Sequence, residues 1–460
     1  MPKAKKRVLE RIAESPAVVL EETIEITTVI TDTIKEVQPI KKAKSFWRML
    51  GPGLTTGAAD DDPSGIATYS QTGAQYGFSL LWLAAFTFPL MAIVQEMCAR
   101  IGMVTGRGLA GNIRQHFPKW VLVAATALLF LANTFNLGAD LGAMAKSFQL
   151  LYPKIDFGFL VLGFAVLSLG LQIFSTYEKY AKYLKYLALV LFSYVITAFV
   201  IPNLDWRALL HDGFIPNLAL GKDQIILICA ILGTTISPYL FFWQTSQEVE
   251  EQILDGNTSI KSRQALTTPE QIHTMRVDVW SGMFLSNLVM FFIIAVTSAT
   301  LFSHGITNIA TPADAAQALR PLAGNNAFLL FAIGVIGTGM LAVPVLAGSA
   351  AYALAETFGW KQGLYRKLKE ATAFYGIIIF SMVIGLLINF IGLDPIKALI
   401  YSAVANGVIA PVVLVFIVML ASNKKIMGKW VNQPTTTWAG WGITLAMAVV
   451  GAASVYYLFT

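Results

Sequence analysis

Apolar runs recur along the chain from residue 46 onward, separated by short segments that hold Gly, Pro and charged residues. A helix of about 20 apolar residues crosses the hydrocarbon core of a bilayer, and a helix satisfies its own backbone polar groups there. The pattern predicts eleven transmembrane helices: 46–76, 79–103, 120–150, 156–174, 180–201, 224–251, 278–302, 327–358, 371–391, 394–420 and 438–459.

The composition supports this reading. Of the 460 residues, 56% are hydrophobic and 13% are charged, whereas soluble proteins carry about 25% charged residues. We therefore expect an all-α polytopic membrane protein. The polar residues 1–45 are predicted to be a cytoplasmic tail and not a signal peptide, because no apolar stretch with a small-residue cleavage site follows their Lys and Arg.

Most of the 33 Lys and Arg residues lie in this tail and in loops on one side of the predicted membrane. The excess of positive charge marks the cytoplasmic side, so we expect the N-terminus inside and the C-terminus outside, with the plasma membrane of a prokaryote as the location. Although the net charge is +6, the cations are not gathered on one patch, so no nucleic-acid partner is expected. We expect contact with the lipid bilayer and, by default, a monomer.

The first predicted span is interrupted by Asp60, Asp61, Asp62, Pro63 and Ser64. Buried carboxylates are costly in a membrane unless a cation or water compensates them, and proline removes a backbone donor. No simple lipid-facing helix tolerates this combination. The sequence predicts an unwound segment that lines a cavity.

The sixth predicted span carries a similar interruption. Gly233, Thr234 and Ser237 precede Pro238 in an otherwise apolar helix. A single proline is usually an ordinary kink, but paired breaks in corresponding spans of two halves indicate an inverted-repeat transporter with its site between the breaks.

The paired breaks also predict the organisation of the chain. We expect a cytoplasmic tail over 1–45, a first five-helix repeat over 46–201, a second over 224–420 and an additional helix over 438–459. The two repeats would place the breaks at the same depth, near the middle of the bilayer.

The residues at the breaks favour a hard divalent cation as cargo. Carboxylates, hydroxyls and the free carbonyls at the ends of the half-helices are all oxygen donors, and the breaks contain no Met, Cys or His. Mg²⁺ requires octahedral oxygen ligands and usually keeps several waters. The candidate metal-binding residues are Asp62, Asp61, Ser237, Gly65, Ala59 and Thr234.

Several segments resemble the Nramp family of divalent-metal transporters. The resemblance rests on GPG at 51–53 followed by Asp62-Pro63-Ser64-Gly65, on GTTISPY at 233–239, and on SAVANGVIAPVV at 402–413 followed by NKKIMG at 423–428. It implies the leucine-transporter fold, a 5+5 inverted repeat with helices 1 and 6 broken. It also implies that the metal is a transported substrate and that the protein is not an enzyme and needs no cofactor.

The metal-binding motifs depart from the family pattern at two positions. Gly65 stands where the family has a ligand Asn, and Ser237 replaces the metal-binding Met. These changes resemble the Nramp-related magnesium transporters. The function predicted from the resemblance and the ligand chemistry is therefore divalent-metal transport by alternating access, with Mg²⁺ as the main cargo and Mn²⁺ also accepted.

The positions associated with proton transfer depart as well. Tyr239 and Gln244 stand where the family has histidines, and Ala143 replaces a glutamate, whereas Asp140 matches a family acid. We therefore expect transport without proton coupling, with a proton-coupled Mn²⁺ or Fe²⁺ transporter as the alternative. Asp140 itself is either a residual proton relay or a structural acid bonded to neighbouring hydroxyls.

Two other functional classes fit the sequence less well. An intramembrane aspartyl protease would pair Asp62 with Asp140, but its Gly-x-Gly-Asp context is absent from 137–140. A sodium-coupled amino-acid transporter would share the fold, but adjacent aspartates would repel the substrate carboxylate.

The remaining chemistry-bearing residues are predicted to have structural or solvent-facing roles. These are the acids Glu248, Glu250 and Glu251, predicted to form a solvated charged face, the cysteines Cys98 and Cys229, predicted to be small core residues, and His116, His211, His273 and His304, predicted not to bind metal.

Overall fold

The computed structural model describes residues 51–174, 192–202, 204–219 and 221–460, and every regular element within these ranges is a helix. The part before residue 220 contains α4 (Pro52–Asp60), α5 (Pro63–Tyr76), η1 (Gly77–Leu80), α6 (Trp82–Thr105), α7 (Leu109–His116), α8 (Lys119–Gln149), α9 (Phe157–Phe174), α11 (Phe192–Val200) and α12 (Trp206–Phe214).

The part after residue 220 contains the longer elements of the chain together with several single turns. These are α13 (Lys222–Thr235), α14 (Pro238–Leu254), α15 (Ile260–Leu266), α16 (Pro269–Thr300), η3 (Phe302–His304), α17 (Pro312–Ala316), η4 (Gln317–Leu319), α18 (Arg320–Ala323), η5 (Gly324–Asn326), α19 (Ala327–Phe358), α20 (Thr372–Ile388), α21 (Pro395–Ala421), α22 (Lys424–Met427), η6 (Gly428–Trp430) and α23 (Pro434–Phe459).

The predicted spans coincide closely with these helices wherever the chain is described. Eight segments within the described ranges are long and apolar enough to cross a membrane, and α20 is a shorter apolar helix. The predicted spans 46–76 and 180–201 fall partly, and the predicted tail over 1–45 falls wholly, outside the described residues. The all-helical membrane fold is thus confirmed, while the number of eleven spans stays a prediction.

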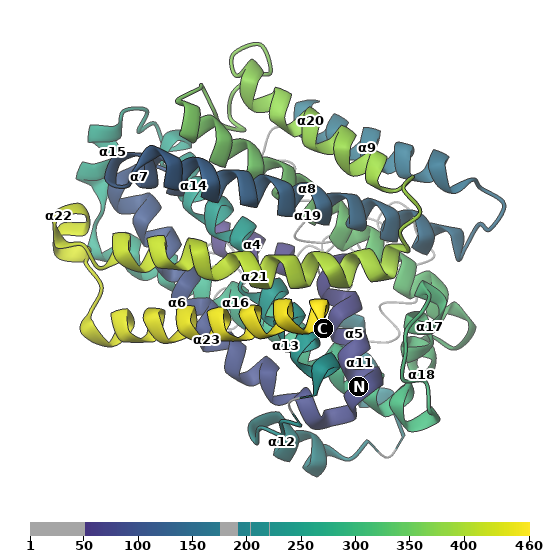
Figure 1. Cartoon of the computed structure of the whole chain (residues 1–460). Coiled ribbons are helices and arrows are strands. Elements are labelled where there is room, and N and C mark those ends of the chain that lie inside the picture. Colours follow the sequence, from purple (N-terminus) through teal and green to yellow (C-terminus); the bar gives the residue numbers. More distant parts are fainter. Residues whose placement is uncertain (1–50, 175–191, 203, 220) are drawn as a thin grey trace, which may run out of the picture. The chain divides into compact units, whose positions relative to one another are not determined.

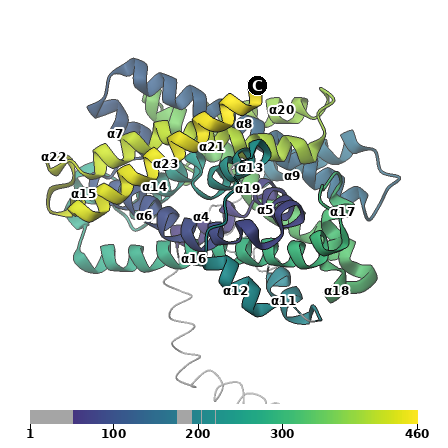
Figure 2. The same ribbon diagram turned by 60° about the horizontal axis from the view of Figure 1, so that its bottom comes forward.

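The helices pack in two groups (Figure 1). In the first group, α16 packs against α4, α5 and α6, and α14 packs against α6; in the second group, α8 packs against α9, α19 and α20. Figure 2 shows α4 lying along α16. The helices α21 and α23 run side by side, and α21 also contacts α8 and α13.

The pairing of helices fits two repeats. The packed pairs α6 with α16, α8 with α19 and α9 with α20 each join corresponding predicted spans of the two halves. Residues 52–460 nevertheless form one unit. The proposed repeats over 46–201 and 224–420 therefore share a common core and are not separate domains.

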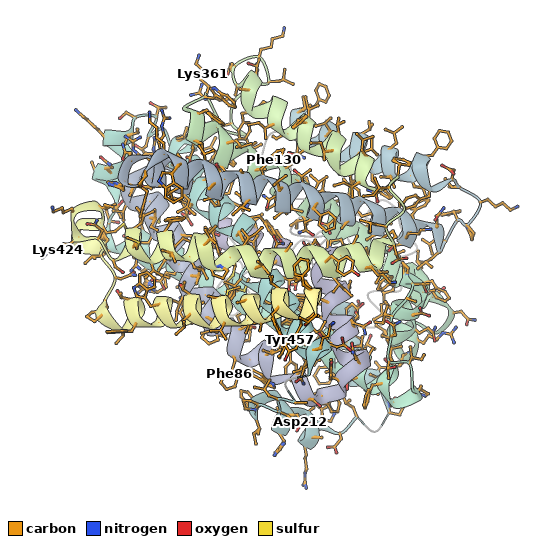
Figure 3. All side chains as sticks on the ribbon, viewed as in Figure 1. Phe86, Phe130, Asp212, Lys361, Lys424 and Tyr457 are labelled. Carbon is orange, nitrogen blue, oxygen red and sulfur yellow. The ribbon has the colours of Figure 1, made fainter. Side chains whose placement is uncertain are left out.

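Apolar side chains cover the outward faces of the helices (Figure 3). Phe86 on α6, labelled there, is 46% exposed. Phe159 on α9 is 74% exposed and Leu445 on α23 is 66% exposed. Such exposure would be costly in water and is expected in lipid. By contrast, Lys424 lies in the connection that follows α21.

Candidate functional site

The first break lies between α4 and α5. The helix α4 ends at Asp60, and α5 begins at Pro63 with Asp62 as its N-cap. The Oδ1 atom of Asp62 accepts hydrogen bonds from Gly65 N at 2.7 Å and from Ser64 Oγ at 2.6 Å. Asp62 therefore satisfies free donors at the start of α5, a role that its position before a proline already favours.

The second break lies between α13 and α14. Ser237 precedes Pro238, but its hydroxyl turns back toward α13 and donates to the carbonyl oxygens of Gly233 at 2.5 Å and Thr234 at 2.8 Å. The last carbonyls of a helix lack intrahelical partners. The Ser237 side chain supplies one for them, so the predicted donors Ser237 and Thr234 are in direct contact.

Hydrogen bonds join the two breaks. The Tyr239 hydroxyl donates to the carbonyl oxygen of Ala59 at 2.9 Å, and the hydroxyls of Thr234 and Tyr69 are 3.1 Å apart. All four residues are buried. Tyr239, predicted as a lost proton-pathway position, thus contacts a predicted metal-ligand carbonyl.

A polar chain continues from Asp62 into α8 and α21. The Oδ2 atom of Asp62 accepts from Asn136 Nδ2 at 3.0 Å, and Asn136 Oδ1 accepts from Ser402 Oγ at 2.8 Å. Asn136 and Ser402 are fully or almost fully buried. Sequence analysis missed both residues, although an amide within an apolar span, one helical turn before Asp140, is a signal that points to function.

The other two carboxylates of the triplet face a different helix. Ser286 of α16 donates to Asp60 Oδ2 at 2.6 Å and lies 3.4 Å from Asp61 Oδ1. Asp62 instead faces α8, so the three adjacent carboxylates do not converge on one point. In the described part of the chain, no group of three or more His, Cys, Asp or Glu side chains is placed to hold a metal.

Asp140 lies fully buried within α8. Neither of its carboxylate oxygens has a hydrogen-bond partner among the described residues. Among the described residues Asp140 therefore makes no hydrogen bond to a neighbouring hydroxyl, and the choice between proton relay and structural acid stays a prediction. Ala143, three residues later, is part of the hydrophobic core.

Gln244 of α14 forms hydrogen bonds to α4 and to a side chain one turn further along α14. Its Oε1 atom accepts from Thr56 Oγ1 at 2.5 Å, and its Nε2 atom donates to Glu248 Oε1 at 2.8 Å. Glu248 is 7% exposed and Glu250 is 2% exposed. The prediction that these two acids face solvent is wrong, because α14 packs against α4, α6 and α19. Glu251 is exposed, as predicted.

The cysteine prediction is confirmed, since both thiols are free and buried. The histidines lie on the surface and belong to no metal-binding group in the described ranges: His116, His211, His273 and His304.

Sequence comparison identifies relatives along nearly the whole chain. The family model described as natural resistance-associated macrophage protein-like (Nramp) matches residues 53–457. A divalent metal cation transporter MntH of Aeromonas hydrophila is 26% identical over 421 residues, 89% of this chain and 95% of the relative. The MntH of Yersinia pestis is 28% identical over 439 residues, 92% of this chain and 97% of the relative.

Comparison with solved structures gives the same fold. A manganese transporter of Eremococcus coleocola superimposes with a TM-score of 0.69 at 18% identity, covering 90% of this chain and 87% of the other. Mhp1, a nucleobase-cation-symport-1 family transporter, superimposes with a TM-score of 0.56 at 14% identity, covering 89% of this chain and 91% of the other.

Proposed function

This chain belongs to the Nramp family of divalent metal cation transporters, and we propose that it carries Mg²⁺ and also accepts Mn²⁺ by alternating access between the two helix breaks. The metal is the substrate, and no cofactor is required. Because its relatives are transporters, the aspartyl protease alternative is set aside.

The donor set at the breaks carries this proposal. Asp62 offers a carboxylate, Ala59 and Thr234 offer carbonyl oxygens, and Ser237 offers a hydroxyl. These are hard donors, suited to Mg²⁺ and Mn²⁺. Gly65 contributes no side-chain donor, so the remaining ligands of the ion would be waters.

Binding of the ion would exchange protein hydrogen bonds for metal ligands. The carbonyl oxygen of Ala59 would lose its hydrogen bond from the Tyr239 hydroxyl, and that of Thr234 would lose its hydrogen bond from the Ser237 hydroxyl. Asp62 would keep its Asn136 partner on Oδ2. Asn136 is thus proposed as a positioning residue for the ligand carboxylate.

The second candidate is proton-coupled Mn²⁺ transport, and the comparisons favour it. The superimposed Eremococcus coleocola protein is named a manganese transporter, and the curated relatives carry the broader name of divalent metal cation transporters. Two features of this chain agree with that candidate. Asp140 is buried without a hydrogen-bond partner among the described residues. The thioether of Met144 also lies near Pro63 at the first break, because both side chains border Gly339. A Cβ built on Gly339 would lie 2.5 Å from Met144 Sδ and 3.3 Å from Pro63 Cγ.

The orientation and organisation of the chain are part of the proposal. The distribution of Lys and Arg supports a cytoplasmic N-terminus and an external C-terminus. We further propose a prokaryotic plasma membrane as the location and 46–201 and 224–420 as the two inverted repeats, with 438–459 added.

Uptake into proteoliposomes distinguishes the two candidates. Mg²⁺ and Mn²⁺ uptake would be measured in parallel while a dye reports internal pH. Mg²⁺ uptake without acidification supports the first candidate. The second candidate is supported if Mg²⁺ is excluded and Mn²⁺ uptake acidifies the interior, with the acidification abolished in Asp140→Asn. A selective loss of Mn²⁺ uptake in Met144→Leu would show that the thioether takes part.

A further inference from the structure

A polar cavity of about 580 Å³ lies away from the helix breaks, where the ends of α6, α14 and α19 approach α7 and α15. Five cationic side chains line it, against two carboxylates, Glu250 and Glu356. The cations are Arg107, Arg114, Arg263, Lys361 and Arg366. All five lie on the side of the membrane predicted to be cytoplasmic, and such a lining disfavours a divalent metal ion as the occupant of this cavity.

Neutral donors saturate Glu356. Its Oε1 atom accepts from Gly108 N at 2.9 Å and from Gln362 Nε2 at 2.8 Å, while its Oε2 atom accepts from Gly111 N at 2.8 Å. Because the carboxylate lies at the start of α7, the backbone donors there stabilise its negative charge.

Glu250 is saturated in the same way. Its Oε1 atom accepts from the Tyr352 hydroxyl at 2.5 Å and from Leu364 N at 2.7 Å, and its Oε2 atom accepts from Tyr365 N at 3.1 Å. Neutral groups thus hold both carboxylates, and because five cations face only two carboxylates, the cavity keeps an excess of positive charge.

The cations remain without a carboxylate in ion-pair distance. Across the described residues, ion pairs within 4 Å involve Glu96 and Asp212 and none of the five cavity cations. Arg263 is held by the backbone carbonyls of Gly106 at 3.1 Å and Thr258 at 2.9 Å. Burial lowers the pKa of the Arg263 guanidinium; the interaction with Tyr365 opposes this shift, and the like charge of Arg107 adds to it.

An unused donor also lines the cavity. Ser246 is 3% exposed, and its hydroxyl has no hydrogen-bond partner among the described residues. Such a buried hydroxyl costs free energy unless it is bonded. The guanidinium groups of Arg114, Arg263 and Arg366 bond backbone carbonyls with part of their donors and pair with no carboxylate within 4 Å among the described residues.

We propose that this cavity binds an organic phosphate through its guanidinium, ammonium and Ser246 hydroxyl groups. Guanidinium groups bind phosphate oxygens with charge-assisted, frequently bidentate hydrogen bonds. The volume of about 580 Å³ suits a small organic ligand. Trp360 and Tyr365 in the lining offer apolar surface to its organic part. The phosphate belongs to a lipid headgroup or to a soluble compound.

Thermal unfolding of the full-length protein in detergent tests this site. Short-chain phosphatidylglycerol and ATP are the two probes, and short-chain phosphatidylcholine is the control without net charge. Ligands that bind the folded state raise its unfolding temperature. The site variant is Arg107→Gln with Lys361→Gln, because these two side chains make no hydrogen bond among the described residues. The matched control is Lys424→Gln with Lys425→Gln, two cations remote from the cavity lining.

We expect phosphatidylglycerol, ATP or both to stabilise the wild type and the control variant, with affinity reduced about tenfold or more in the site variant. Stabilisation by phosphatidylglycerol alone identifies a site for a lipid headgroup. Stabilisation by ATP alone identifies a site for a soluble organic phosphate. Ser246→Ala removes only the unused hydroxyl and should also weaken binding. It takes the place of the site variant if that variant fails to fold. Equal stabilisation of wild type and variants, equal stabilisation by phosphatidylcholine, or no effect of either probe would overturn the proposal. None of these readouts involves metal transport.

Discussion

The Tyr239 hydroxyl donates a hydrogen bond to the carbonyl oxygen of Ala59 at 2.9 Å and thereby joins the two broken helices. The bond connects a residue at the start of α14 to the free end of α4. A carbonyl at such an end can accept either a hydroxyl or a metal ion. Tyr239 is therefore expected to compete with the cargo for this oxygen.

Replacing Tyr239 with phenylalanine removes this competitor. A hydrogen bond contributes about 0.5–1.5 kcal/mol, so we expect Tyr239→Phe to transport Mg²⁺ with an apparent affinity up to about tenfold higher. Concentration-dependent uptake in proteoliposomes measures this. Tyr375→Phe is the matched control, because the Tyr375 hydroxyl bonds the Arg366 carbonyl away from the breaks. Loss of uptake in well-folded Tyr239→Phe would show that the hydroxyl is itself required.

The charge of Asp62 can be separated from its role as a helix cap. Asparagine is also a good N-cap, so Asp62→Asn should fold normally and lose transport, because only the charge that attracts the cation is removed. Asp62→Ala should lose transport and in addition about 1 kcal/mol of stability. Uptake and thermal unfolding together distinguish these effects.

The control for this pair is Asp205→Asn, since Asp205 caps α12 in a similar way. It should leave both uptake and unfolding nearly unchanged. Wild-type uptake by a folded Asp62→Asn protein would remove Asp62 from the set of ligands.

The local part of the site could be predicted from sequence, and the long-range part could not. Both breaks are encoded locally by Pro63 and Pro238 with their small and polar neighbours. The long-range partner of Asp62 is Asn136 of α8, which in turn accepts a hydrogen bond from Ser402 of α21, and these separations in sequence leave no local pattern. The amide of Asn136 within an apolar span is a signal of function, but the sequence alone does not identify Asp62 as its partner.

The acids of α14 illustrate the same limit. Glu250 is part of a charged run that resembles a solvated helix end. Its burial follows from Tyr352 on α19 and from the backbone of 364–365, which supply its donors. A charged run indicates exposure only when no distant element packs against it.

Asn136 should matter to transport through the orientation of Asp62. In Asn136→Ala the Oδ2 atom of Asp62 loses its partner, and we expect the apparent affinity for the cargo to fall about tenfold. Ser402→Ala, which removes the donor to Asn136, should have a smaller effect in the same direction. Uptake at several metal concentrations measures both. A larger loss in Ser402→Ala than in Asn136→Ala would contradict this order.

Asp61 is predicted to strengthen the hold on a hydrated divalent ion through its charge. Asp61→Ala should therefore raise the Mg²⁺ concentration needed for half-maximal uptake. Ser286→Ala is the matched control, because it removes the hydrogen bonds to this carboxylate and to Asp60 but keeps both charges. An unchanged affinity in Asp61→Ala would place Asp61 outside the site.

Selectivity is predicted to depend on Ser237, which offers a hydroxyl where the family has a thioether. A thioether favours softer ions and offers little to Mg²⁺, so Ser237→Met should shift preference toward Mn²⁺ and lower Mg²⁺ uptake. Adding Gly65→Asn should strengthen the shift by supplying the amide ligand of the family. The structure makes that second change demanding: a Cβ at Gly65 would lie 3.2 Å from the Asp60 carbonyl oxygen and 3.2 Å from Tyr69 Cε2.

The single variant is therefore the sharper test. It also disturbs the end of α13, because the hydroxyl of Ser237 bonds the carbonyls of Gly233 and Thr234. Ser237→Ala removes these bonds without adding sulfur and is the matched control. Competition of Mn²⁺ with Mg²⁺ uptake should rise in Ser237→Met relative to Ser237→Ala. Equal competition in the two variants would show that position 237 does not select the metal, and exclusion of Mg²⁺ by the unmutated protein would favour Mn²⁺ as the cargo.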